Sequence, residues 1–101
     1  MILHVTDAKY LEGYRVQLEF NNGRKGIADL NDSLDGRVFA PLRDKKYFAQ
    51  LKLDRELDTI SWPNGADFAP EYLYFLVFKE DPELQEQFQK WGYQAEQIAQ
   101  L

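Results

Sequence analysis

Residues 62–78 read WPNGADFAPEYLYFLVF, and this stretch predicts three elements in succession. Pro63 restricts Trp62 to an extended conformation, so we expect a strand to run up to Trp62. Pro63-Asn64-Gly65 then combines a fixed φ angle with two residues that accept turn geometry. Pro70 suits the first position of a helix, where its missing N–H group costs nothing. The run YLYFLVF is apolar around most of a helix's circumference, which predicts a helix buried on more than one side.

Two acidic residues flank the predicted helix start. Asp67 precedes Pro70 in the turn, and Glu71 follows Pro70 directly. Because Ala69 is a poor helix cap, we expect the Asp67 carboxylate to accept hydrogen bonds from nearby backbone N–H groups. Glu71 is expected to complement the helix dipole. On this interpretation, Asp67→Ala costs about 0.5–2 kcal/mol, the range for lost helix caps.

Upstream of this stretch, the sequence predicts an antiparallel meander. Residues 14–20, YRVQLEF, alternate apolar and polar side chains with the period of two that is typical of a half-buried strand. Asn22-Gly23 follows and predicts a two-residue hairpin, because both residues tolerate positive φ. Residues 24–30 are the expected return strand, and residues 2–11 are the expected third strand.

The middle of the chain predicts short elements. A polar connection covers residues 31–36, and Pro41 argues against a central strand after it. Asp44 is a suitable cap for a short helix. Residues 51–53 and 59–62 flank a charged segment and predict a second hairpin. The predicted fold class is α+β: an antiparallel meander of three strands plus a second hairpin, with short helices and a C-terminal helical extension.

The composition changes after Phe78, so we predict a small α+β domain at 1–78 and a C-terminal helical extension of the same domain at 79–101. Asp81-Pro82-Glu83 marks a second helix start. Apolar residues recur after it at helical spacing, with Gly92 as a break. Because exposing such an apolar stripe to water is unfavourable, we expect it to form a homodimer interface. Packing on the chain's own sheet is the alternative. The candidate interface residues are Leu84, Phe88, Trp91 and Ile98.

Length and composition bound the class of protein. A length of 101 residues corresponds to one domain, and the chain has no cysteine for a disulfide or a thiolate metal site. The N-terminus shows no signal-peptide pattern. The longest apolar run is far shorter than the roughly 20 residues that cross a bilayer. We therefore expect a cytoplasmic protein without a membrane contact. Because its formal charge is −5, the protein as a whole attracts nucleic-acid phosphate poorly.

The sequence lacks the common metal-binding and cofactor-binding patterns. Residues 31–42 resemble a calcium loop superficially, but Leu42 occupies the place of the required bidentate glutamate. His4 is the only histidine, which excludes a multi-histidine metal site. The glycines of the first half lie in hairpin and turn contexts rather than in a phosphate-binding loop. We expect no metal and no cofactor.

Two alternatives from other functional classes stay open. A small enzyme would use Asp67 and Glu71 as general acid and base, which requires a cleft and shifted pKa values. A nucleic-acid-binding accessory protein would use a local cluster of cations, namely Arg37, Arg43, Lys45 and Lys46. A steep salt dependence of affinity would characterise this second alternative.

Several motifs resemble the short bacterial proteins known as domain of unknown function 2442. The resemblance covers about residues 1–76 and rests on Phe20, Gly23, Ile27-Ala28-Asp29-Leu30, Gly36-Arg37-Val38-Phe39-Ala40-Pro41-Leu42, Phe48, Thr59-Ile60-Ser61-Trp62-Pro63-Asn64-Gly65-Ala66-Asp67 and Pro70-Glu71-Tyr72-Leu73. It implies a small α+β domain without an assigned catalytic activity. Members of that family occur alone or joined to a helix-turn-helix segment. They are often encoded beside a second small family (4160), an arrangement similar to a toxin–antitoxin pair.

The tail departs from this family pattern, since residues 79–101 extend beyond the usual domain and are too short for a trihelical DNA-binding segment. The function we expect is that of a non-catalytic protein-interaction domain, the partner or antitoxin-like half of a two-gene module. A protein partner is expected, and direct contact with nucleic acid is not. The candidate functional residues are those of the turn and helix start: Trp62, Pro63, Asn64, Gly65, Asp67, Pro70 and Glu71.

Overall fold

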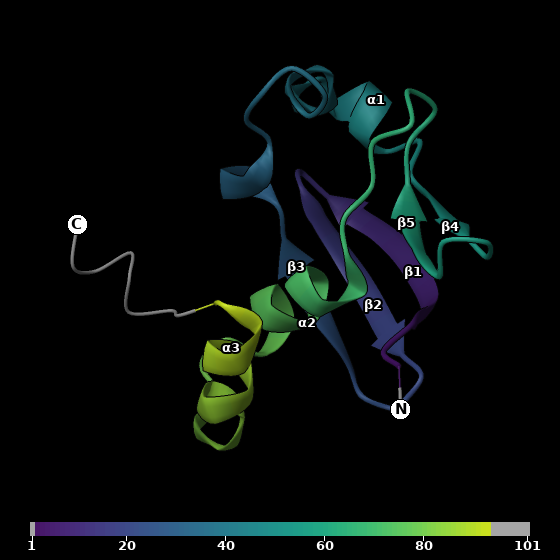
Figure 1. Ribbon diagram of the computed structural model, residues 1–101. Helices are drawn as coiled ribbons and strands as arrows, with labels where there is room; N and C mark the ends of the chain where they lie inside the picture. Colours follow the sequence, from purple (N-terminus) through teal and green to yellow (C-terminus); the bar gives the residue numbers. More distant parts are fainter. Residues whose placement is uncertain (1, 94–101) are drawn as a thin grey trace.

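The computed structural model describes residues 2–93 and has the predicted α+β fold (Figure 1). Five strands and three α-helices make up these residues, with three short 3₁₀ turns between them. The strands are β1 (Val5–Glu12), β2 (Arg15–Phe20), β3 (Lys25–Asp29), β4 (Lys52–Asp54) and β5 (Thr59–Ser61). The helices are α1 (Lys45–Phe48), α2 (Pro70–Phe78) and α3 (Gln85–Trp91), and the 3₁₀ turns are η1 (Asn31–Ser33), η2 (Ala40–Arg43) and η3 (Pro82–Leu84). No helix in this part of the chain is long and apolar enough to cross a membrane.

The strands form the predicted meander and the predicted second hairpin. Strands β1, β2 and β3 lie in that order in one antiparallel sheet, and β4 pairs with β5. The alternation expected in β2 is confirmed, because Val16, Leu18 and Phe20 are buried in the core while Arg15 is exposed. Strand β1 begins later than the predicted residues 2–11, at Val5, and its pairing with β2 shifts register at two points.

The β2–β3 connection lies where the sequence placed it, but the predicted turn type is wrong. The N–H of Gly23 donates to the carbonyl of Phe20, and the N–H of Phe20 donates to the carbonyl of Arg24, both at 2.9 Å. Gly23 has a φ of +86°, whereas Asn22 does not adopt a positive φ. Asn22 instead accepts a bond from the N–H of Arg24 through its side chain. These features define a three-residue loop in which only the glycine is left-handed.

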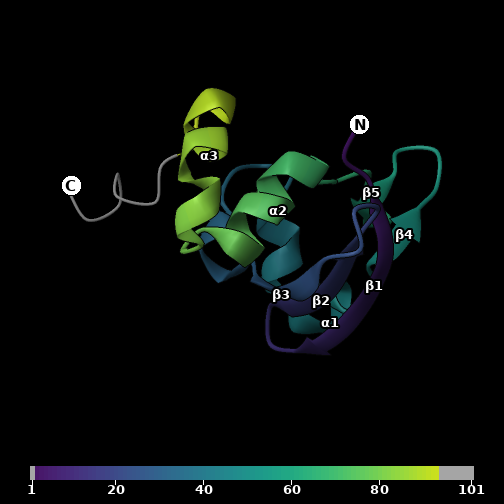
Figure 2. The ribbon, with the colours of Figure 1, turned by 90° about the horizontal axis from the view of Figure 1, so that it is seen from below.

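Helix α2 packs on the inner face of β3, and its central residues Leu73, Tyr74 and Phe75 are buried (Figure 2). The side chain of Val77 lies directly over Gly26 of β3, so close that a Cβ atom on Gly26 would stand 2.5 Å from Val77 Cγ1. The buried side chains between α2 and the sheet belong to one continuous hydrophobic cluster. The expectation that α2 is buried on more than one side is thereby confirmed.

Helix α3 packs on α2 rather than standing free of the domain. The buried Phe88 ring lies 5.2 Å from that of Phe75 and 6.3 Å from that of Tyr74, measured between ring centroids. Asp81 caps the predicted helix start by accepting from the N–H of Glu83. The break predicted at Gly92 is confirmed, since helix α3 ends at Trp91 and Gly92 adopts the left-handed conformation.

A polar clamp joins the β2–β3 turn to the connection between α2 and α3. Arg24 Nη2 lies 2.9 Å from Asp81 Oδ2, and the Arg24 guanidinium lies 4.3 Å from the centroid of the Phe78 ring. The hydrogen bond from Arg24 and a second one from the backbone N–H of Glu83 lower the pKa of Asp81. The same ion pair, together with the Tyr74 hydroxyl, raises the pKa of Arg24.

This clamp predicts a pH dependence of stability. Because the pKa of Asp81 is lowered by folding, its contribution is present above its unfolded pKa of about 3.9 and is lost as pH falls through the folded value. We expect the wild-type protein to lose more stability than Asp81→Asn between about pH 6 and pH 3. Urea unfolding at a series of pH values measures the difference. Glu86→Gln, which alters the exposed pair of Glu86 with Lys90, is the control and should follow the wild type. Identical pH profiles for wild type and Asp81→Asn would contradict this prediction.

Candidate functional site

The turn that follows β5 is closed by its own backbone. The N–H of Gly65 donates to the carbonyl of Trp62, and the N–H of Trp62 donates to the carbonyl of Ala66, both at 2.9 Å. Gly65 has a φ of +87°, a conformation that glycine adopts without strain. Ser61 and Asp67 form a further antiparallel bridge. The predicted turn at residues 63–65 is therefore confirmed, and backbone hydrogen bonds join the residues on either side of it.

Trp62 anchors this turn in the core. Its side chain is 2% exposed, and its indole N–H donates to the carbonyl of Phe48 at 2.8 Å. Its ring packs against those of Phe48 and Phe68, with centroids 5.5 and 5.8 Å away. Trp62 thus connects the turn to α1 and has almost no surface to offer to a ligand.

Asn64 connects the turn to a segment far away in the sequence. Its side-chain amide donates to the carbonyl of Val38 at 3.0 Å, and its side-chain oxygen accepts from the N–H of Ala66 at 3.0 Å. Next to Val38, the Phe39 ring stacks on that of Phe68 at 4.7 Å. Two of the motifs that carry the family resemblance are therefore brought together on one side of the molecule. We call this area the turn surface and define it by six exposed residues: Arg37, Val38, Pro63, Asn64, Gly65 and Asp67.

Asp67 does not have the role predicted for it. Its carboxylate accepts no hydrogen bond from residues 2–93, and Ala69 begins α2 without any side-chain cap. The acceptor in the turn is Asn64, which lies one residue before the glycine and is positioned to bond Ala66. Pro70 does occupy the first helical position, as predicted.

Asp67 and Glu71 are the two acids of the enzyme alternative. Neither carboxylate lines any of three depressions on the surface of residues 2–93. Glu71 lies instead near Tyr93, where burial, the negative charge of Glu71 and the neighbouring Tyr72 together raise the pKa of the Tyr93 hydroxyl.

A pair of substitutions tests the assignment of Asn64. Asn64→Ala removes both bonds of the side chain and should cost about 1–2 kcal/mol, since each net hydrogen bond contributes about 0.5–1.5 kcal/mol. Asp67→Ala, in the same turn, should stay within about 0.5 kcal/mol of wild type. Urea unfolding midpoints measure both variants. A larger loss for Asp67→Ala than for Asn64→Ala would restore Asp67 as the acceptor that holds the turn.

The four predicted cations differ in their surroundings. Arg43 contacts Asn31 at 3.1 Å and Asp35 at 3.9 Å, and Arg43 and Lys45 both lie over the Tyr14 ring, at 5.5 and 5.8 Å from its centroid. Lys45 and Tyr14 also line a depression of about 380 Å³ beside Glu12 and Asp29. Arg37 lies on the turn surface, and neither Arg37 nor Lys46 has an ion-pair partner among the described residues.

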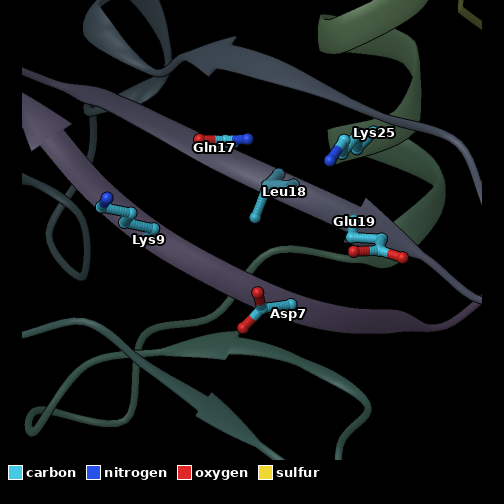
Figure 3. A pocket seen from close by; sticks show the side chains of 6 residues that line it. All are labelled: Asp7, Lys9, Gln17, Leu18, Glu19 and Lys25. Carbon is cyan, nitrogen blue, oxygen red and sulfur yellow. The ribbon is translucent and has the colours of Figure 1, made fainter.

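The outer face of the sheet carries another depression, of about 260 Å³, which Figure 3 shows. Charged side chains from all three strands surround it, and Asp7 stands directly opposite Glu19 in the pairing of β1 with β2. A solvated outer face is usual for an antiparallel sheet whose other face is packed. The lining residues are Asp7, Lys9, Gln17, Leu18, Glu19 and Lys25. A third depression lies at residues 52–56, in β4 and the turn that follows it.

Within residues 2–93, no group of three or more histidine, aspartate or glutamate side chains is arranged to hold a metal ion. The one histidine, His4, lies 3.5 Å from Asp58 at the edge of the second hairpin, and both side chains are partly exposed.

The predicted interface residues lie partly within the chain's own core. Phe88 is 1% exposed, and Leu84 and Trp91 are half-buried against the same cluster. Ile98 lies outside the described residues. Association of this helix with a second chain stays a prediction, and Phe88 offers little surface for it.

Val38 is an exposed apolar residue of the turn surface that was not among the candidate functional residues predicted from the sequence. Its side chain is 51% exposed although it stands within an apolar run, Val38-Phe39-Ala40. The preceding Gly36, which has a φ of +90°, starts the turn that directs Val38 outward while Phe39 stacks inward. The signal in the sequence that could have indicated this turn is a glycine shortly before an apolar run.

The chain belongs to the family described as "Protein of unknown function (DUF2442)", whose model matches residues 5–79. The resemblance inferred from the sequence motifs is thus confirmed at the level of the family. No curated protein matches the chain. The fold is similar to that of the crystal structure of "Putative DNA Binding Protein NE0471" from Nitrosomonas europaea ATCC 19718, with a TM-score of 0.71 and 17% sequence identity. The match covers 97% of this chain and 66% of that chain, and at this identity it shows the fold alone.

Proposed function

We propose that this protein is a non-catalytic protein-interaction domain and that the turn surface is its contact with a partner. The observation that carries the proposal is the way in which Asn64 fixes Val38. Both polar ends of the Asn64 side chain are used within the chain, and the result is a firmly held surface on which Val38 and Pro63 face solvent. A single exposed apolar residue is ordinary. A surface built from two distant segments that hydrogen bonds hold together is suited to binding because little conformational entropy is lost on contact.

Two further observations support a binding role over a catalytic one. Neither Asp67 nor Glu71 lines any of the three depressions described above, whereas a general acid and base require a cleft. Trp62, which would have formed the wall of such a cleft, is buried and bonded to Phe48. The placement in a two-gene module, as its partner or antitoxin-like half, rests on the family resemblance alone.

Nucleic-acid binding is the second candidate function, and one observation favours it. Residues 36–53 carry five basic side chains and one acidic side chain, so this segment has a balance of +4 within a chain of −5. The similar structure NE0471 is also named for DNA binding, although the match leaves about a third of that chain uncovered. Binding of this kind would depend steeply on salt concentration.

A matched pair of surface variants tests the proposed function. Val38 and Leu57 are 51% and 49% exposed, and Leu57 lies in the β4–β5 turn outside the turn surface. We expect the tagged wild-type protein and Leu57→Glu to co-purify from their native cells with the same stoichiometric protein partner. Val38→Glu should lose this partner while keeping its own urea stability. Absence of any stoichiometric partner, or equal recovery with all three proteins, would contradict the proposal.

A further inference from the structure

The turn surface has a chemical character that narrows the kind of partner it fits. Val38 provides an apolar contact, and Arg37 beside it is exposed with no ion-pair partner among residues 2–93. An arginine that is not neutralised within its own chain can form charge-assisted hydrogen bonds with an incoming carboxylate. The surface therefore combines an apolar contact with an adjacent cation.

The charge of the whole molecule favours an acidic ligand at this end. Residues 36–53 have a balance of +4, whereas residues 70–93, which hold α2 and α3, have two basic and five acidic side chains, a balance of −3. The first segment holds η2 and α1, which lie at the opposite end of the molecule from α3 (Figures 1 and 2). A charge distribution of this kind attracts an acidic partner to one end and repels it from the other.

On the basis of the proposed function, we propose that the turn surface binds a segment of another protein in which carboxylates flank an aliphatic side chain. The aliphatic side chain packs on Val38 and Pro63, and a carboxylate bonds to the Arg37 guanidinium. The partner is thereby identified as an acidic, aliphatic segment of another protein.

The details of the surface favour protein over nucleic acid. Phosphate binding requires several cations directed at one backbone, each adding to the salt dependence. Here Arg43 is bound to Asn31 and Asp35, and Lys45 lies over the Tyr14 ring.

Selection from a displayed library of random short peptides tests the proposal and does not require that the natural partner be identified first. The bait is the wild-type protein, and peptides that also bind Val38→Glu are removed. We expect the remaining peptides to carry an aliphatic residue with acidic residues on either side. Their affinity should fall at least about tenfold with Arg37→Glu, a loss of about 1.4 kcal/mol, and should be unchanged with Leu57→Glu. All variants are first shown to have the same urea unfolding midpoint as the wild-type protein.

The outcomes of the selection separate this proposal from the one on which it rests. Peptides that require Val38 but carry no excess of acidic residues would overturn the acidic-partner proposal and leave the interaction domain in place. Recovery of no peptide that requires Val38 would count against both. Duplex DNA is the other probe: binding that weakens equally with Arg37→Glu and Lys46→Glu, falls steeply with salt and is unaffected by Val38→Ala would overturn both in favour of nucleic-acid binding.

Discussion

Phe88→Ala is expected to cost about 3–5 kcal/mol of the free energy of unfolding. The Phe88 side chain is 1% exposed, and its ring lies against those of Phe75, Tyr74 and Trp91. Truncation to alanine removes these contacts and leaves a cavity between α2 and α3 that the surrounding helices only partly fill. Urea unfolding monitored by tryptophan fluorescence and by circular dichroism measures the loss.

The control lies on the other side of the same helix. Glu86 is exposed, and Glu86→Ala should change the stability by no more than about 0.5 kcal/mol. Sedimentation of the same proteins distinguishes the competing view of α3 as a dimer interface. If Phe88→Ala dissociated a wild-type dimer into monomers of nearly unchanged stability, Phe88 would belong to a contact between chains and its packing on α2 would be misassigned.

The features predicted correctly from the sequence are those set by residues a few positions apart. Pro63 and Pro70 limit the backbone at their own positions, so the end of β5 and the start of α2 were both predictable. The alternation in β2 likewise reports which face is buried, because neighbouring side chains on a strand point to opposite faces. In each case the physical cause acts within one element.

The roles of Asn64 and Asp67 show where this kind of prediction fails. Both are short polar side chains that can accept a bond from a nearby backbone N–H. Which of them does so depends on its place relative to Gly65, and the sequence assigned the role to the wrong one. The second bond of Asn64, to the carbonyl of Val38, depends on tertiary packing between segments 26 residues apart. No local pattern announces it.

Gly26 is a similar case, with a larger energetic consequence. A glycine inside a strand indicates a bulge or the close approach of another part of the chain. The sequence shows the glycine but not the residue that approaches it. In the structure that residue is Val77 of α2, and the contact fixes how closely the helix lies on β3.

Gly26→Ala is expected to destabilise the protein by about 1–3 kcal/mol, the range for overpacking a well-packed interior. Gly26 does not adopt a positive φ, so alanine fits the backbone and by itself would stabilise the protein by about 0.4–1 kcal/mol through the unfolded state. The steric term must exceed this gain. It does so because the new Cβ atom would stand 2.5 Å from Val77 Cγ1, and a β-branched valine has little rotamer freedom in a helix.

The decisive measurement is the coupling between Gly26→Ala and Val77→Ala in their effects on the free energy of unfolding. Val77→Ala alone removes packing from a half-buried side chain and should cost about 1 kcal/mol. In the double variant the atom that collides with the new methyl group is gone, so its total loss should be smaller than the sum of the two single losses by about 1 kcal/mol or more. Leu76→Ala, at the neighbouring half-buried position, serves as the control and should add its loss to that of Gly26→Ala without coupling. Strict additivity with Val77→Ala would mean that Gly26 is there for a reason other than the approach of α2.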